Sequence, residues 1–125
     1  MKIEVSIGEV LDKYTILLIK EIKISDEKKL YNVRKERQYL ESIIGELSAS
    51  IKIFVDDLFS INEKLWNIED QIRTKDSLNQ FDEEFISLAR SVYHTNDERA
   101  KMKKTLNELC NSEFVEEKQY SKYRN

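Results

Sequence analysis

The sequence predicts an all-α fold, an antiparallel bundle of four to five helices, and three observations indicate it. Gly occurs twice and Pro is absent from the 125 residues, whereas the tight turns of strand-rich folds usually draw on both. Apolar side chains recur at intervals of three and four along most of the chain, the period of a helix with one buried face. Hydrophobic residues make up 40% and charged residues 36%, which excludes a disordered tail and a membrane protein.

The N-terminal residues show a short strand signal and then a helix. Residues 2–7 alternate polar and apolar side chains, which is typical of a strand. Ser6 stands three residues before Glu9, the spacing of a capping box, and this predicts a helix over about 7–24. The strand could pair with the alternating residues 114–120 of the tail, which would add a minor two-stranded terminal β-ribbon to the bundle.

Two longer helices are expected in the middle of the chain. Ser25 or Asp26 caps a helix over about 26–47, and a third helix follows over about 50–74. The third helix has the clearest pattern, an apolar seam formed by Ile51, Phe54, Leu58, Ile61, Leu65, Ile68 and Ile72. Such an unbroken seam is typical of a helix that packs along an antiparallel partner, as in a coiled coil.

That partner is expected to be the last helix, which follows a loop at residues 75–82 and is capped by Asp82. The last helix extends to about residue 111, and the HTND run at 94–97 leaves open whether it is one helix or two. Residues 1–125 are therefore expected to form a single helical domain, whose tail from about residue 112 is the least clearly patterned part.

A polar stripe runs beside the seam of the third helix and is the candidate functional feature. A hairpin of the last two helices would bring this stripe close to polar residues of the last helix, with Glu69 near Arg90. The expected cluster consists of Asn62, Trp66, Glu69, Asp70, Arg73, Arg90, Asn96, Asp97 and Arg99. Converging aromatic, amide, guanidinium and carboxylate groups are what a small-molecule site needs. Glu9, Asp12 and Lys13 join them if the first helix lies against the hairpin.

A purely structural role is the competing interpretation of this cluster, because ion-pair networks gather the same residue types. Glu69 and Arg90 would then form an interhelical pair that sets the register of the hairpin. Trp66 would be a core residue whose indole N–H needs one partner. Neither interpretation identifies catalytic residues, so whether the protein is an enzyme stays open.

Metal and redox chemistry find little support in the residue types. One histidine, His94, and one cysteine, Cys110, exclude a multi-histidine metal site and an internal disulfide, and no metal site is predicted. Carboxylates could still hold Mg²⁺, as the ExxE and ExxD pairs of all-α nucleotide pyrophosphohydrolases do. Glu69 and Asp70 are adjacent instead, and adjacent side chains do not share a helix face. No cofactor is expected, and Mg²⁺ enters only under the alternative function below.

Charge and hydropathy restrict the partners. The net charge of −3, without a basic run, argues against nucleic acid. The longest apolar run, residues 16–19, is too short to span a membrane, and the charged N-terminus does not resemble a signal peptide, so a cytoplasmic location is expected. The leading hypothesis is a non-enzymatic helical interaction module that self-associates, as a homodimer, or binds another protein. The alternative is a small-molecule or Mg-dependent nucleotide-binding or nucleotide-hydrolysing protein that uses the polar cluster.

Four stretches of the chain, EVSIGEVLDKYTILLIK, LWNIEDQIR, FISLARSVYHTNDERAKMK and VEEKQY, resemble an uncharacterised bacterial family of small helical proteins. The pattern of that domain of unknown function reads KIEVSxGELLDKxTILxIK, then LWxIEDxIR, then LARSVYxTNDxRA. Val10 stands here in place of a usual leucine. The resemblance implies a free-standing, single-domain bacterial protein and implies no particular activity.

Overall fold

The computed structural model describes residues 1–112 and 117–123 of the chain. In this part of the chain every element of regular secondary structure is a helix, so the predicted all-α class is confirmed. The helices are α1 (Ile7–Lys23), α2 (Glu27–Ile44), α3 (Ala49–Ser77) and α4 (Glu83–Leu109). Their limits lie within a few residues of those expected from the three-four spacing of apolar side chains.

Each helix begins at a polar side chain that accepts a hydrogen bond from an amide of the first turn. The four caps are Ser6, Asp26, Ser48 and Asp82. Three of them, Ser6, Asp26 and Asp82, were expected from the sequence. Because the first amides of a helix have no partner within the helix, such caps determine where each helix starts.

The predicted terminal strand is not found in the described residues. Residues 1–5 have no regular structure, Ser6 caps α1, and Ile7 already lies in the helix. Ile3 and Val5 are 78% and 44% exposed, so these two apolar side chains of the alternation lie outside the core. Residues 117–120 are also irregular, and residues 114–116 of the expected ribbon lie outside the described part of the chain.

The HTND run does not interrupt the last helix. Helix α4 continues from Glu83 to Leu109, so the one-helix alternative is correct. Thr95, which would have capped a second helix, is 1% exposed. The residue lies inside the continuous helix instead of at the start of a new one.

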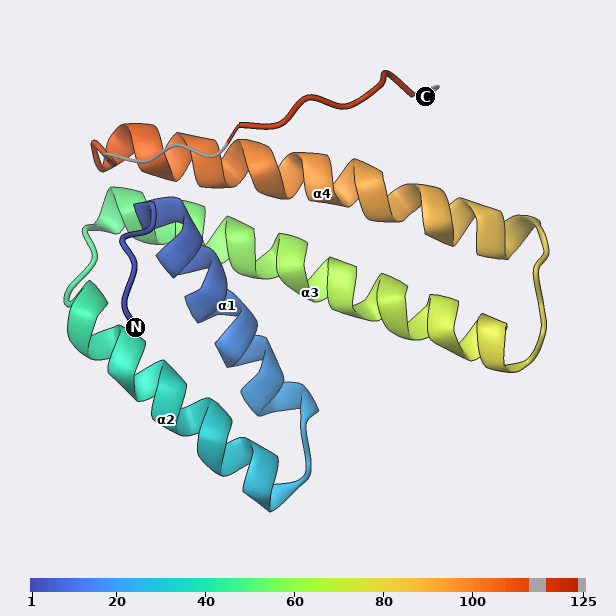
Figure 1. Cartoon of the computed structure of the whole chain (residues 1–125), viewed down its shortest axis with the longest axis horizontal. Helices are drawn as coiled ribbons and strands as arrows, with labels where there is room; N and C mark the ends of the chain where they lie inside the picture. The colour runs from blue at the N-terminus through green and yellow to red at the C-terminus, as the bar shows by residue number, and fades with distance from the viewer. Residues whose placement is uncertain (113–116, 124–125) are drawn as a thin grey trace.

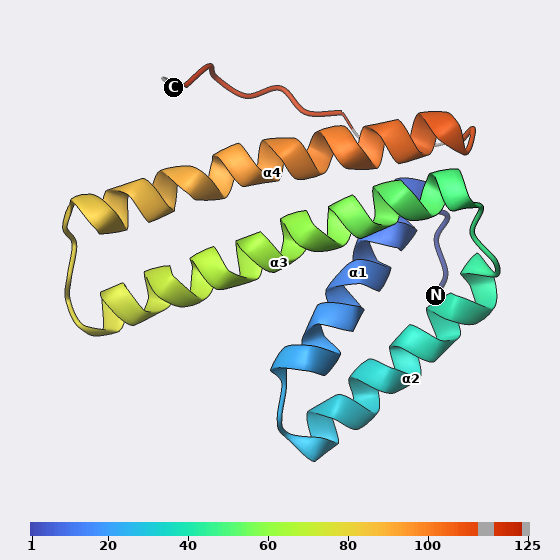
Figure 2. The ribbon, with the colours of Figure 1, turned by 180° about the vertical axis from the view of Figure 1, so that it is seen from behind.

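The helices form two hairpins that meet at one end (Figures 1 and 2). Helices α3 and α4 lie side by side, with the chain reversing between Ser77 and Glu83, while α1 and α2 form the second hairpin. Helix α1 contacts all three other helices, whereas α2 packs on α1. Towards its C-terminal end α1 diverges from the α3–α4 hairpin, so α1 lies against α3 and α4 over only part of its length.

Two apolar clusters stabilise this arrangement. The junction of α1, α3 and α4 buries Leu11, Val55, Leu58 and Leu106. The α1–α2 hairpin buries Leu17, Val33 and Leu40. No helix in the described residues combines the length and the apolar character needed to cross a membrane.

Candidate ligand-binding cleft

An open cleft of about 390 Å³ lies where α1 diverges from the α3–α4 hairpin. Its walls come from three helices. It is lined by Ile16, Ile19, Asn62, Leu65, Trp66, Glu69, Asp70, Arg73, Asn96 and Arg99. Seven of these belong to the nine-residue cluster expected from the sequence: Asn62, Trp66, Glu69, Asp70, Arg73, Asn96 and Arg99. The cleft thus combines an apolar part with a dense set of polar groups.

The two remaining members of the expected cluster lie elsewhere. Arg90 lines a different hollow together with His94 and donates a hydrogen bond to the Tyr93 hydroxyl. Asp97 accepts a hydrogen bond of 2.6 Å from the Tyr123 hydroxyl. The residues brought together are therefore those of the polar stripe of α3 and two residues of the central part of α4.

The expected proximity of Glu69 and Arg90 does not appear in this arrangement. Glu69 lines the cleft and lies 3.5 Å from Arg73, its neighbour one turn along α3, whereas Arg90 lines the other hollow. The reason is the rotation of α3. Its polar stripe is directed at the space between α1 and α4, so Asn62 contacts Asp12 and the stripe shares the cleft with Asn96 and Arg99 and not with Arg90.

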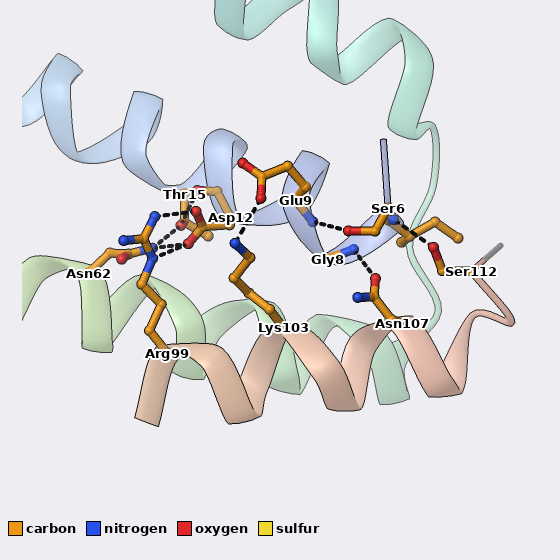
Figure 3. A network of polar contacts seen from close by, with 11 residues as sticks. Ser6, Gly8, Glu9, Asp12, Thr15, Asn62, Arg99, Lys103, Asn107 and Ser112 are labelled. Carbon is orange, nitrogen blue, oxygen red and sulfur yellow. Dashed lines mark hydrogen bonds and ion pairs between the residues drawn. The ribbon is translucent and has the colours of Figure 1, made fainter. Parts of the chain in front are cut away.

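Asp12 of α1 is the centre of a buried hydrogen-bond network next to the cleft (Figure 3). Its carboxylate, 1% exposed, accepts two hydrogen bonds from Arg99 of α4, at 2.8 Å from Nε and 2.5 Å from Nη2. It also accepts one of 2.9 Å from Nδ2 of Asn62 in α3. The same Nδ2 donates to Thr15, whose hydroxyl donates in turn to the Asp12 carbonyl. One carboxylate therefore links three helices.

The surroundings of Asp12 determine its protonation state. Burial by itself raises the pKa of the carboxyl, but the hydrogen bonds from Arg99 and Asn62 and the charges of Arg99 and Lys103 outweigh burial. The pKa of Asp12 consequently lies below its ordinary value of 3.8. The network is thus built around a carboxylate that stays ionised at neutral pH.

Further polar contacts continue the network along α1 and α4 (Figure 3). Lys103 pairs with Glu9 at 2.7 Å, and Asn107 accepts a hydrogen bond of 2.6 Å from the amide of Gly8. A Cβ at Gly8 would lie only 2.5 Å from the Lys103 carbonyl oxygen, so the helices approach here as closely as a glycine allows. These contacts hold the N-terminal part of α1 on α4, where the two hairpins meet.

Asn62 connects this network with the cleft. The residue is 5% exposed, and its amide nitrogen is engaged by Asp12 and Thr15. Within the described residues its Oδ1 accepts no hydrogen bond, and the oxygen points away from Asp12 (Figure 3). Because Asn62 also lines the cleft, this oxygen is a fixed acceptor at the cleft wall.

Three of the other lining residues carry polar groups that no described residue engages through a hydrogen bond or ion pair. They are Trp66, Asp70 and Asn96. Across the described residues, no group of three or more His, Cys, Asp or Glu side chains is arranged to hold a metal ion. The chemistry available in the cleft is therefore hydrogen bonding, charge and contact with an aromatic face.

Several network residues were not singled out from the sequence. Thr15, Lys103 and Asn107 were missed, and Asp12 was expected only as an additional member. A signal exists in the four-residue spacing of Arg99, Lys103 and Asn107, which places three polar side chains on one face of α4. Polar residues repeated on one helix face beside apolar ones would have suggested a polar contact with another helix.

These features define an all-α protein of two helical hairpins, with a polar network that fixes the first helix and a cleft beside it. The chain belongs to a family of unknown function, DUF6165, which it matches over residues 1–123. The resemblance noted from the sequence to a family of that kind is thereby confirmed. No curated protein and no solved structure matches the chain.

Proposed function

We propose that the protein binds a small organic molecule in the cleft between α1, α3 and α4. The observation that carries this proposal is the cleft wall at Asn62, whose amide nitrogen is fixed by Asp12 and Thr15 and whose oxygen has no partner in the described residues. Because the amide nitrogen is held by two contacts, the oxygen keeps its position at the wall and can accept a hydrogen bond there. A ligand that donates to this oxygen would meet a group that is already oriented.

The size and rigidity of the cleft support the same function. Its volume of about 390 Å³ is within the range of small-molecule sites. Asn62 and Arg99, which line it, are each held by Asp12, so their side chains are oriented before a ligand arrives. Binding to a preformed site loses less conformational entropy than binding to mobile side chains.

A ligand screen with the full chain tests the proposal. Trp66 is the single tryptophan and lines the cleft, so its fluorescence reports on ligands there, while the melting temperature reports on binding anywhere. We expect at least one compound of a library of small metabolites to change both. Asn96→Ala should reduce both responses, because Asn96 lines the cleft and makes no hydrogen bond that folding requires.

The matched control is Asn67→Ala, which removes an exposed asparagine of α3 that does not line the cleft. Its responses should equal those of the unmodified protein. The proposal fails if no compound alters Trp66 emission. It also fails if Asn96→Ala responds like the control to every compound that binds.

A homodimeric interaction module is the second candidate, favoured by apolar side chains at the turn between α3 and α4. Leu78, Phe81 and Ile86 are 60%, 55% and 55% exposed there, and exposed apolar groups of this kind often mark a protein interface. Sedimentation velocity should then show a dimer that Phe81→Ser dissociates. Tyr31→Ser, which removes a 67% exposed aromatic ring of α2, is the control and should leave it intact. A monomer at all concentrations refutes this candidate.

A further inference from the structure

The charges around the cleft leave a negative excess. Arg99 is directed at Asp12 through two hydrogen bonds, and Arg73 lies near Glu69. Asp70 is exposed to the cleft and forms no ion pair with any described residue. With Asp12 behind Arg99, three carboxylates face two guanidinium groups. A positive charge on a bound ligand would therefore neutralise the excess negative charge of the cleft.

The hydrogen-bonding groups of the cleft also favour a donor. The Asn62 oxygen can only accept, and so can the carboxylates of Glu69 and Asp70. The carboxylates of Glu69 and Asp70 decide between ligand classes, because they can only accept hydrogen bonds and also carry negative charge. An anion such as phosphate or a carboxylate would place its own acceptor oxygens against these groups.

The apolar side of the cleft matches the carbon body of such a ligand. Ile16, Ile19 and Leu65 can cover methylene or ring carbons. The face of Trp66 attracts an ammonium or guanidinium group placed within about 6 Å of the ring centre. The same indole therefore suits both parts of a molecule that joins a cationic head to a short apolar body.

We propose that the ligand of this cleft is a small organic cation, an amine or guanidine whose charged head pairs with Asp70 and whose carbon body packs against Trp66. This inference rests on the proposed binding function and names the class of molecule bound. It requires no metal ion and no covalent step. The two contacts come from α3, at positions four residues apart and therefore about one helical turn from each other on the same face.

Three probes of similar size and different charge test the class. Phenethylamine is a cation, phenethyl alcohol is its neutral counterpart, and hydrocinnamate is an anion of the same shape. Each is titrated into the full chain while the emission of Trp66 is followed under selective tryptophan excitation. We expect saturation by phenethylamine, binding of the alcohol that is about tenfold weaker, and no saturation by hydrocinnamate.

Asp70→Asn removes the unpaired charge at an exposed position, where folding does not depend on it. It should weaken the binding of phenethylamine about threefold, the size expected of an exposed ion pair, and leave the binding of phenethyl alcohol unchanged. Asp57→Asn, an exposed carboxylate of α3 outside the cleft, is the matched control and should change neither. Raising the salt concentration should weaken the binding of phenethylamine to the unmodified protein more than its binding to Asp70→Asn.

Each contrary result has a distinct meaning. Saturation by hydrocinnamate but not by phenethylamine overturns the cation assignment and leaves cleft binding in place. Equal binding of the amine and the alcohol, or equal effects of Asp70→Asn and Asp57→Asn, shows that charge does not select the ligand and overturns it as well. If none of the three probes changes Trp66 emission, the cation class is wrong. The library screen then decides separately whether the cleft binds anything.

Discussion

Replacing Arg99 by leucine tests whether the buried carboxylate of Asp12 governs the position of α1. The substitution removes the guanidinium group but keeps an apolar side chain of considerable size at a position whose side chain is 29% exposed. Asp12, 1% exposed, then keeps the hydrogen bond from Asn62 and the more distant charge of Lys103. Removing one partner of a buried ion pair typically costs about 3–5 kcal/mol, because the other charge stays buried without compensation.

Protonation limits this loss. The Asp12 carboxyl can take up a proton, and at about pH 7 this costs about 4 kcal/mol, from about 1.36 kcal/mol per pH unit over about three units above its ordinary pKa. We therefore expect Arg99→Leu to lower the free energy of unfolding by about 3–4 kcal/mol near neutral pH. At about pH 4 protonation costs almost nothing, so the loss should shrink to about 1–2 kcal/mol for the missing hydrogen bonds.

The two proteins should therefore differ in the direction of their pH dependence. The folded pKa of Asp12 is lowered in the unmodified protein, so its stabilising contribution is present above pH 3.8 and is lost as the pH falls through the folded pKa. In Arg99→Leu, burial is no longer outweighed and the folded pKa should lie above 3.8. The destabilisation is then fully present at neutral pH and is relieved on acidification.

Urea unfolding followed by far-UV circular dichroism, at several pH values, measures both effects. Arg73→Leu is the control, because its side chain is 78% exposed and its contact with Glu69 is long, so the change should stay within about 0.5 kcal/mol. Adding Asp12→Asn to Arg99→Leu removes the buried charge and should restore part of the lost stability at neutral pH. A loss below about 1 kcal/mol for Arg99→Leu, or one that grows on acidification, would refute the reasoning.

Four further substitutions probe the packing of the helices and the end of α2, each measured by urea unfolding. Gly8→Ala should cost about 2–3 kcal/mol, because its Cβ would meet the Lys103 carbonyl oxygen at 2.5 Å. Gly45→Ala meets open space but requires φ +65° and ψ −154°, a conformation that glycine adopts far more readily than alanine, so it should cost about 1–3 kcal/mol through the backbone alone. Asn107→Ala should cost about 1–3 kcal/mol through the unpaired Gly8 amide, and an unchanged midpoint would contradict that contact. Leu58→Ala should cost about 2–5 kcal/mol, because Leu58 is 0% exposed at the junction of the helices, and a smaller loss would indicate a looser core.

Helix positions could be predicted from the sequence because their determinants are local. A cap such as Asp82 acts on an amide three residues further on, and the seam of α3 repeats within each turn. The strand prediction at residues 2–7 failed for the converse reason. Alternation specifies which side chains could be buried together, but a strand also requires a partner strand. Ser6 instead caps α1, so the helix begins at the next residue.

The sequence predicts which residues belong to the candidate site, but it does not predict which of them contact one another. Residues on one face of α3 stay together however the helix packs, so the joint appearance of Asn62, Trp66 and Glu69 in one cleft follows from their spacing. Which helix they face depends on the rotation of α3 about its axis, and periodicity alone does not contain this angle. Asp12 was underestimated because a single carboxylate beside apolar neighbours is usually exposed, and only its three-helix contacts show that it is buried.

The divergence of α1 from the α3–α4 hairpin explains why one stripe of α3 is partly core and partly cleft. Beyond Asp12 the C-terminal half of α1 runs away from the hairpin, and its residues Ile16 and Ile19 line the cleft. Where α1 lies against the hairpin, Asn62 is buried and bonded to it, and beyond that contact Glu69 and Arg73 are exposed. A polar stripe can continue past the point where its covering helix diverges at no desolvation cost, because water replaces the missing contacts. The cleft therefore forms at the one place where the stripe is both held by α1 and open to a ligand.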